Sequence, residues 1–551
     1  MPAISCDYMA FWSNYHRTRT GMFNGAGQIR ELARMFVADA SHLPGPERFA
    51  ATGRTLNDFY ATVLAGHGGS IPMPPARDCV PVGRGWSFSG LVGAYDMQLD
   101  MGGLAGCSPA APDDLHPDAA YPADRIALVS GGTRLRELVN WAEGRGKSIL
   151  TSGTHLGMTV AGGAATASHG SRLGYGGIQN QIAGMHIITG PQTSVWIEPS
   201  SKAVLSDECA AKFSNLPPIR DDALFADVLV HLGAMGIVNG VAFELADNDG
   251  YDVLAVFQPV DQAWLDQVAN YEFRAIASNL GYDEEPVFYE ATLDPWDFAG
   301  PVATHTMYFK SALPPDPATV ASGPRASDAV AQAPAYLAQK ILHFDPLWSP
   351  ERNGPVDPPE LPEGFSVFGL YAHELFKQTQ INSGQPATSW GGLHLDEITG
   401  GYPGALYNAS FAVKPIDIPV VIPMICAAMA GLDPVFLFTL RFVDNAAGTL
   451  AFTRFSQNVV IEIDGFSENA PVFGHYGHNT REGALRIREA LDGAGIEYGM
   501  HWAKLGQLDA TKVAADFGSA IGRWRGTRDQ LLSTQMREIC WNTAVVQYGL
   551  V

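Results

Sequence analysis

Hydrophobic positions along the chain follow two spacings, and each spacing predicts its own set of elements. Apolar residues three and four positions apart predict helices over 26–38, 54–66, 133–145, 419–430 and 480–493. Short apolar or alternating runs predict strands over 79–82, 125–130, 148–151, 182–189, 194–198, 436–443 and 459–464. The stretch 91–121 is rich in Gly, Pro and Asp, which predicts a loop. The chain is therefore expected to mix helices and strands.

Two glycine-rich segments interrupt this pattern. Residues 81–90 read Pro-Val-Gly-Arg-Gly-Trp-Ser-Phe-Ser-Gly, so the predicted strand 79–82 leads straight into this segment. Glycines let backbone N–H groups approach an anion closely, so this loop could cradle a pyrophosphate; a plain turn is the alternative. It has neither the Lys-Ser/Thr end of a P-loop nor the Gly-x-Gly-x-x-Gly spacing. Small residues also dominate 151–172, and such a backbone can pack flat against a planar group.

Composition narrows the class of protein. The 551 residues carry a formal net charge of −22, which argues against a nucleic-acid or anionic-membrane partner. The start of the chain shows no targeting signal, and prolines break the apolar run 418–432 before it could span a bilayer. The six cysteines form no Cys-x-x-Cys, so neither a metal site nor a disulfide framework is expected. These features predict a cytoplasmic protein with reduced thiols.

Five segments, in order along the chain, resemble one known superfamily. They read Val-Gly-Arg-Gly-Trp-Ser-Phe (82–88), Thr-Val-Ala-Gly-Gly-Ala-Ala-Thr-Ala-Ser-His-Gly-Ser (159–171), Leu-Gly-Ala-Met-Gly-Ile-Val (232–238), Leu-Arg-Phe-Val (440–443) and His-Trp-Ala-Lys (501–504). Asp-Phe-Gly at 516–518 also fits. The chain thus resembles the FAD-linked oxidases of the vanillyl-alcohol oxidase superfamily. It looks most like alditol oxidases and sugar-1,4-lactone oxidases, and more distantly like cholesterol oxidase.

The resemblance implies an α+β fold with a PCMH-type FAD-binding domain and an α/β substrate domain containing a large antiparallel sheet. More Pro, Trp and Tyr after Asn248 place the boundary there, so we predict an FAD domain over 1–248 and a substrate domain over 249–499. Residues 500–551 would complete the FAD domain and the active site.

The resemblance also implies where FAD lies. Its pyrophosphate would sit on the 83–89 loop, 153–171 would line the flavin, and 236–239 would contact the adenine end. The expected cofactor-binding residues are Gly83, Arg84, Gly85, Trp86, Ser87, Phe88, Gly153, Thr154, Thr159, Gly162, Gly163, Ala167, His169, Gly170, Ser171, Gly236, Ile237, Val238 and Lys504.

Trp86 departs from the alditol-oxidase pattern. Those enzymes have a histidine there that bonds covalently to the flavin, and tryptophan cannot form that bond. We therefore predict non-covalent FAD, with His155 or His169 as alternative tethers. Gly153 leaves room for O2 at the flavin face, or it is simply a turn glycine. Thr154 keeps a hydroxyl that can bond the flavin edge.

The expected catalytic residues follow from the same comparison. Arg441 and Lys504 would stabilise negative charge that collects at the N1–C2=O end of the flavin. Thr439 stands where alditol oxidases have a glutamate that orients the substrate hydroxyls, which puts polyol specificity in doubt. Glu462 and Asp464 share one face of a strand, and either could take the hydroxyl proton; ordinary half-exposed strand residues are the alternative.

His501 is a further candidate proton acceptor, or a packed histidine that helps to place Lys504. Tyr289, Glu290, Trp296 and Asp297 could form a wall of the substrate site. The sequence Trp-Gly-Gly-Leu-His-Leu-Asp over 390–396 matches no metal spacing and is interpreted as a loop.

The function that we predict is oxidation of a CH–OH group of a small or moderately apolar alcohol, by hydride transfer to flavin N5 and reoxidation by O2 to give H2O2. The partners would be a small-molecule substrate and O2. A dehydrogenase with another electron acceptor stays open. So do a biosynthetic flavoenzyme for oxidative cyclisation or desaturation, and a flavin-binding scaffold without turnover. The sequence does not indicate an oligomeric state.

Overall fold

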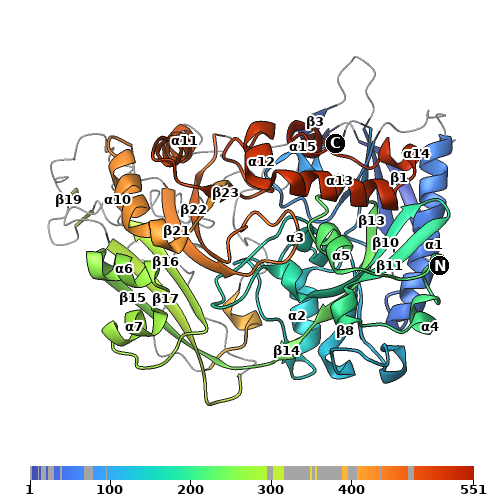
Figure 1. The fold of residues 1–551 in the computed structure, drawn as a ribbon, viewed down its shortest axis with the longest axis horizontal. Helices are drawn as coiled ribbons and strands as arrows, with labels where there is room; N and C mark the ends of the chain where they lie inside the picture. Colours follow the sequence, from blue (N-terminus) through green and yellow to red (C-terminus); the bar gives the residue numbers. More distant parts are fainter. Residues whose placement is uncertain are drawn as a thin grey trace.

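The structure is a computed structural model that describes most of the chain. It describes residues 3–9, 11–13, 20–22, 30–36, 40–66, 78–94, 96–294, 302–315, 348–349, 354–355, 387–394, 406–432, 436–468 and 477–551. Two halves lie side by side along the longest axis, as Figure 1 shows. The half at the right of that view is built mostly from residues before 248, and the half at the left from residues after it.

Two sheets and a long helix build the first half. One sheet has the order β1-β4-β6-β5 and the other the order β12-β11-β10-β13-β8-β7. The strands of the four-stranded sheet are β1 Ala3–Met9, β4 Arg30–Phe36, β5 Cys79–Val82 and β6 Met97–Asp100. Those of the six-stranded sheet are β7 Cys107–Pro109, β8 Ile126–Ser130, β10 Ile182–Gly190, β11 Thr193–Glu198, β12 Ile219–Arg220 and β13 Ile237–Glu244. Smaller strands are β2 Phe11–Ser13, β3 Thr20–Met22, β9 Lys147–Ser148 and β14 Ala246–Asp247.

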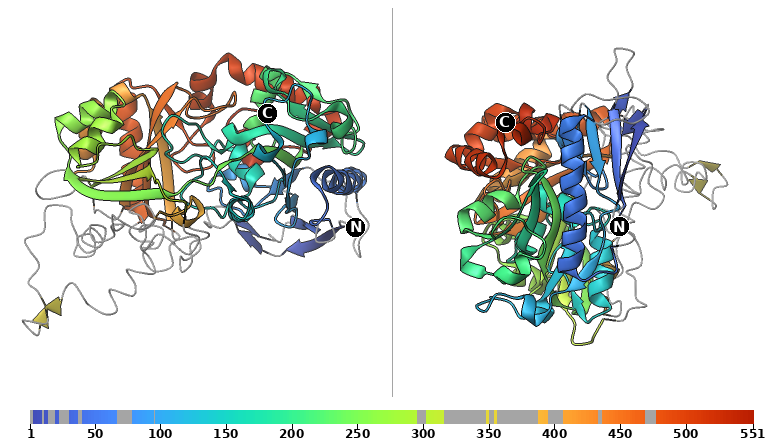
Figure 2. Two further views of the ribbon diagram at one scale, coloured as in Figure 1. Left: turned by 90° about the horizontal axis from the view of Figure 1, so that it is seen from below. Right: turned by 90° about the vertical axis from the view of Figure 1, so that its right-hand side faces the viewer.

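The helices of this half cover the six-stranded sheet. Helix α1 (Gly45–Ala65) contacts β10 and β13; it stands at the right edge of the molecule in Figure 1 and runs vertically through the middle of the right-hand view of Figure 2. Its side chains Phe49, Leu56 and Tyr60 are fully buried. The other helices are α2 Leu135–Glu143, α3 Val160–Ala165, α4 Asp207–Ala210 and α5 Asp222–Leu229.

A seven-stranded sheet forms the second half. Its order is β15-β17-β16-β21-β22-β20-β23, and every pairing in it is antiparallel. Its strands are β15 Tyr251–Pro259, β16 Phe288–Asp294, β17 Val302–Lys310, β20 Leu406–Val413, β21 Phe436–Asp444, β22 Gln457–Phe466 and β23 Tyr498–Met500. The associated helices are α6 Gln262–Ala269, α7 Phe273–Asn279, α10 Ile418–Ala428 and α11 Gly477–Gly493. A two-stranded sheet pairs β18 Trp348–Ser349 with β19 Gly354–Pro355.

The two faces of the seven-stranded sheet differ, because side chains alternate along a strand. One face carries Tyr289, Phe438, Leu440, Phe442 and Ile461, all fully buried or nearly so. Phe442 packs at 4.8 Å between ring centres on Phe273 of α7, and α11 contacts β22. The other face carries polar side chains and looks toward the first half.

The end of the chain returns to the first half. Helices α12 Ala510–Phe517, α13 Ser519–Leu531, α14 Thr534–Arg537 and α15 Thr543–Gln547 run back across it, as the red ribbon in Figure 1 shows. Helix α13 contacts α5, and buried Asp227 of α5 accepts hydrogen bonds from Thr527 of α13, at 2.6 Å, and from Thr449. The three ranges proposed as domains, 1–248, 249–499 and 500–551, stay a prediction.

Most predicted elements are confirmed, and three are wrong. The mixed α+β fold with a large antiparallel sheet is confirmed, as are the strands at 79–82, 125–130, 182–189, 194–198, 436–443 and 459–464 and the helices near 54–66, 133–145, 419–430 and 480–493. The predicted helix over 26–38 is wrong, because Arg30–Phe36 pairs as a strand with both β1 and β6. The predicted loop over 91–121 contains β6 and β7, whose ladder bonds override its turn-rich composition. The strand over 148–151 shrinks to Lys147–Ser148.

Among the described residues, no helix is both long and apolar enough to cross a membrane. Cys79, Cys107, Cys209, Cys426 and Cys540 are free thiols.

Candidate functional site

A cavity lies where the two halves meet, and segments far apart in sequence line it. They are the loop 81–88, the stretch 153–169, the turn 231–233, strands β20, β21 and β22, and the segment 501–504. Predicted site residues on its wall are Gly83, Arg84, Gly85, Trp86, Ser87, Phe88, Gly153, Thr154, Thr159, Gly162, Gly163, His169, Val238, Arg441, Glu462, Asp464, His501 and Lys504. The folding of the chain thus brings together most of the residues that the sequence singled out.

The two glycine-rich segments touch one another. A Cβ atom at Gly83 would lie 2.4 Å from Oγ1 of Thr159, so only glycine allows this approach. Gly85 has a φ of +68°, in the region that other residues rarely adopt. The amide of Phe88 donates to the carbonyl of Ala503 at 2.7 Å, which ties the loop to the segment that carries Lys504.

Trp86 lies beside His155, one of the two alternative tethers. Their ring centres are 5.4 Å apart and tilted by 33°. Both side chains line the cavity. The non-covalent attachment predicted for FAD therefore concerns the position at which the Trp86 indole lies beside the His155 imidazole.

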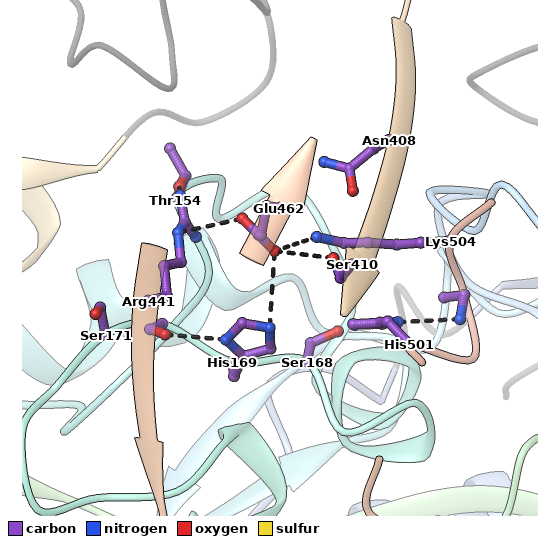
Figure 3. Close-up of polar contacts among 12 residues, drawn as sticks. Thr154, Ser168, His169, Ser171, Asn408, Ser410, Arg441, Glu462, His501 and Lys504 are labelled. Carbon is purple, nitrogen blue, oxygen red and sulfur yellow. Dashed lines mark hydrogen bonds and ion pairs between the residues drawn. The ribbon is translucent and has the colours of Figure 1, made fainter. Parts of the chain in front are cut away.

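Glu462 is the centre of a buried charged cluster, shown in Figure 3. Its Oε1 accepts a hydrogen bond from Nζ of Lys504 and lies 3.3 Å from Oγ of Ser410. Its Oε2 forms an ion pair with Nε of Arg441 at 3.2 Å. Arg441 also donates from Nη2 to Oγ1 of Thr154 at 2.5 Å. The carboxylate thus holds both predicted cations in place at the cavity wall.

Cross-strand register explains how Glu462 reaches this position. It pairs directly with Thr439 on β21 and with Ser410 on β20. Arg441 pairs with Glu290 on β16, and its Nη2 is 3.5 Å from the Glu290 carboxylate. Where alditol oxidases are expected to carry a glutamate, this chain has Thr439. A carboxylate stands instead on the neighbouring strand, directly opposite.

The pKa values of Glu462 and Asp464 shift in opposite directions, although both residues lie on the same face of β22. Burial alone would raise the pKa of Glu462, but the charges of Arg441 and Lys504 outweigh it and hold this pKa well below its usual range. Burial, and then repulsion by Glu462, raise the pKa of Asp464 to about 7. Near neutral pH Glu462 is therefore ionised, whereas Asp464 exchanges its proton.

Backbone contacts fix opposite tautomers on two cavity histidines. Nδ1 of His169 lies 3.0 Å from the carbonyl of Gly170, which can only accept, so Nδ1 carries the proton and Nε2 is bare. Nδ1 of His501 accepts from the amide of Ala503 at 3.0 Å, so its proton is on Nε2. Burial lowers the pKa of His169 to about 4 and that of His501 well below its usual value. His501 is thus a neutral hydrogen-bond donor, a geometry that disfavours its predicted alternative role as proton acceptor.

Six predicted residues do not belong to the described cavity wall: Thr439, Ala167, Gly170, Ser171, Gly236 and Ile237. Ser171 accepts from the amide of Phe442 at 2.8 Å and donates to the carbonyl of Tyr289, so it fastens the second glycine-rich segment to β21 and β16. Gly236 has a φ of +101°, and Ala167 has one of +54°. Thr439 is fully buried beside the cluster, and its hydroxyl has no hydrogen-bond partner among the described residues.

The predicted substrate wall is only partly described. Glu290 joins the charged cluster, whereas Tyr289 points to the other face of the sheet and bonds Trp264. Trp296 and Asp297 lie outside the described residues. In the stretch interpreted as a loop, Trp390 is buried and donates to Oγ of Ser152 at 3.0 Å, next to Gly153.

Sequence reasoning missed several cavity residues. Asn408, whose Nδ2 donates to Asp464, lies on β20 in a region without a motif. His231 also lines the cavity. Its only signal in the sequence was its position directly before the segment 232–238. Described residues elsewhere hold no group of side chains suited to a metal ion.

The wall of the cavity fits an FAD molecule. Gly83 and Gly85 have no side chains to cover the backbone of the loop, which leaves N–H groups for a pyrophosphate, and a Cβ atom at Gly83 would clash with Thr159. Arg441 and Lys504 offer cations at one end, and the small residues Gly153, Gly162 and Gly163 leave a flat wall. Each feature would suit a different part of a flavin dinucleotide.

No family model matches the chain. A stretch of 116 residues is 33% identical to L-gulonolactone oxidase 3 of Arabidopsis thaliana, and it covers 21% of this chain and 18% of that protein. The solved cholesterol oxidase from Brevibacterium sterolicum matches over 99% of this chain and 97% of that one, with a TM-score of 0.59 and 12% identity. A structure described as a solvent-stable cholesterol oxidase matches over 99% and 98%, with a TM-score of 0.58 and 12% identity. These findings establish the fold and support both the predicted superfamily and FAD as cofactor.

Proposed function

We propose that this chain, which has the fold of the FAD-linked oxidases of the vanillyl-alcohol oxidase superfamily, oxidises a CH–OH group to a carbonyl with O2 as electron acceptor. One observation carries the proposal. The buried cluster of Arg441, Glu462 and Lys504 lines the same cavity as the glycine loop 83–88. A dinucleotide bound to that loop would therefore lie in a cavity whose wall also carries the two cations Arg441 and Lys504.

Different segments of the chain would hold different parts of the cofactor. The loop 83–88 would receive the pyrophosphate, and 153–163 would lie along the flavin. When bound, FAD supplies the acceptor for a hydride from the substrate carbon and returns the electrons to O2 as H2O2. Arg441 and Lys504 are pre-positioned by Glu462, so they would stabilise developing negative charge without rearrangement. Release of free FAD on denaturation is expected, because Trp86 offers no tether.

Asp464 is the group that we assign to the hydroxyl proton. It lines the cavity, Asn408 orients it, and its raised pKa of about 7 lies near the working pH, where a general base is most effective. Glu462 is a poor base, because two cations stabilise its ionised form. His501 would instead donate from Nε2 to a substrate oxygen.

The polar face of the seven-stranded sheet changes the expected substrate. Unpartnered oxygens there belong to Thr292, Thr439, Asn408 and Glu290, whose carboxylate makes an ion pair but no hydrogen bond among the described residues. Buried oxygens without partners are costly. Among these four residues, Asn408 alone lines the cavity, so its oxygen is the one that a substrate hydroxyl can reach. This supports an alcohol with a hydroxyl beyond the one oxidised rather than the small or moderately apolar one that the sequence predicted.

A paired substrate screen tests the proposal. Purified protein is offered matched alcohols, one set rich in hydroxyls and one set apolar, and both H2O2 and anaerobic bleaching of the flavin band are followed. We expect bleaching and H2O2 with the first set. Bleaching by no alcohol contradicts the alcohol assignment. Bleaching without H2O2, together with photoreduced flavin that persists for minutes in air, identifies a dehydrogenase instead.

The cytoplasmic location stays a prediction.

A further inference from the structure

His231 is a buried cavity residue without a role in the proposed reaction. Its side chain is 5% exposed and lines the cavity, and its Nδ1 accepts from the amide of Gly233 at 3.0 Å. Nδ1 therefore carries no proton, and in the neutral ring the proton is on Nε2. Burial lowers the pKa of His231 to about 4, which keeps the ring neutral at physiological pH. Its Nε2 is buried and has no hydrogen-bond partner among the described residues.

A second buried histidine shows what an ordinary core position looks like. His186 of β10 also has an Nε2 without a hydrogen-bond partner in the described part of the chain. Its ring, however, packs against the rings of Phe49 and Phe213, at 6.2 Å and 4.8 Å between centres, and it does not line the cavity. His231 differs because it stands at the wall of the proposed cofactor site.

The turn that presents His231 is strained. Leu232 has a φ of +52° and Gly233 one of +73°. A leucine in this region is unusual, and such strain persists only where the surroundings impose it. Leu232 and Gly233 also line the cavity, so the strain lies at the site itself.

The end of the chain holds this turn in place. Nε1 of Trp524 donates to the carbonyl of Val230 at 3.2 Å, Nδ2 of Asn542 donates to that of Leu232 at 2.7 Å, and Nε of Arg528 donates to that of Ala234 at 2.9 Å. Three buried side chains from 524–542 thus clamp alternate carbonyls on either side of His231. A clamp of this kind fixes where a side chain is aimed.

From these observations we propose that Nε2–H of His231 donates a hydrogen bond to an acceptor atom of the bound FAD, from a strained turn that the C-terminal segment holds in place. The inference rests on the proposed cofactor. The acceptor is an oxygen or ring nitrogen of either the ADP half or the FMN half. A neutral donor suits both, because it satisfies an acceptor without bringing a charge into the cavity.

Affinity for FAD tests the inference without any substrate. Holoproteins of wild type, His231→Phe, His231→Gln and His186→Phe are diluted, and FAD release is followed by the rise in flavin fluorescence. We expect His231→Phe to raise the Kd about tenfold, the loss typical of a buried hydrogen bond. His231→Gln, which keeps a donor, should recover most of the affinity. His186→Phe should keep the wild-type Kd.

Competition identifies the half that is contacted. Excess ADP or FMN displaces FAD from each protein, and the competitor that His231→Phe binds about tenfold more weakly carries the acceptor. An unchanged Kd for FAD in His231→Phe overturns the inference and leaves the cofactor assignment standing. An equal loss of affinity in His186→Phe overturns the inference as well. A wild-type protein that holds no FAD overturns the cofactor assignment together with the inference.

Discussion

The two faces of the seven-stranded sheet are built from alternate residues of the same strands, yet they have opposite chemistry. On β21, Phe442 packs against Phe273 and Tyr289, whereas the preceding residue, Arg441, pairs with Glu462 at the cavity. On β22, Ile461 lies in the core, and Glu462 and Asp464 lie on the cavity side. One face is stabilised by burial, and the other keeps ionised and unpartnered groups. Stability and chemistry should therefore separate between neighbouring residues.

The largest expected effect comes from Asp464, as proton acceptor on the polar face. Asp464→Asn should lower the rate of anaerobic flavin reduction by roughly 10²–10⁴-fold, because the hydroxyl proton loses its acceptor. In the wild-type protein the rate should rise about tenfold from about pH 6 to pH 8, as Asp464 ionises. Stopped-flow absorbance measures both. A variant that keeps both the rate and the pH dependence would contradict the assignment.

Arg441 and Phe442 offer a comparison between adjacent residues. Arg441→Met should slow flavin reduction by about 10²–10³-fold, since a pre-positioned charge is lost. Phe442→Ala should instead lower the free energy of unfolding by about 3–5 kcal/mol and keep the rate per folded molecule. Urea titration and stopped-flow together separate the two. Equal losses of rate in both variants would show that the two faces of the sheet do not have separate roles in catalysis and stability.

The carboxylates also predict how stability depends on pH. The folded-state pKa of Asp464 is raised from 3.8 to about 7, so the folded protein holds this proton more tightly than the unfolded chain. Its contribution to stability is complete at low pH and is lost as the pH rises through about 7. Glu462, with a lowered pKa, gives the opposite dependence at more acidic pH. Asp464→Asn should flatten the change in melting temperature between pH 5 and 8; an unchanged profile would contradict the shift.

Thr439 gives the smallest expected effect. Its buried hydroxyl has no hydrogen-bond partner among the described residues, so Thr439→Val should not lower the melting temperature. If that hydroxyl binds substrate, KM for a hydroxyl-rich alcohol should rise about two- to tenfold, with KM for an apolar alcohol unchanged. Steady-state kinetics with both alcohols decide the matter. A drop in stability with no change in KM would assign Thr439 to the core.

Local patterns were a good guide where one element determines its own structure. The strand at 79–82 agrees with its apolar run, and the helix predicted over 54–66 agrees with the second half of α1, which begins at Gly45 and ends before Gly66. The helix predicted over 26–38 failed because pairing with β1 and β6 outweighs the three-to-four spacing. Such non-local hydrogen bonds leave no trace in a short window of sequence.

The site residues also fall into two groups: those that a local motif indicates, and those that only the fold brings to the cavity. Motifs pointed to Arg441, Lys504 and the glycine loop, but not to the pairing of Thr439 with Glu462 across two strands, which only the register reveals. Asn408 and His231 carry no motif, and they matter because folding brings them to the cavity wall. The aim of His231 depends on Asn542, more than three hundred residues away in sequence.

The flavin content of the purified protein tests the central claim most directly. After heat or acid denaturation and centrifugation, we expect about one FAD per chain in the supernatant, held until then by the glycine loop, the charged cluster and packing alone. Flavin that stays with the precipitate would mean a covalent tether, with His155 beside Trp86 as the first residue to replace. Protein without flavin, and unable to take up added FAD, would contradict the account.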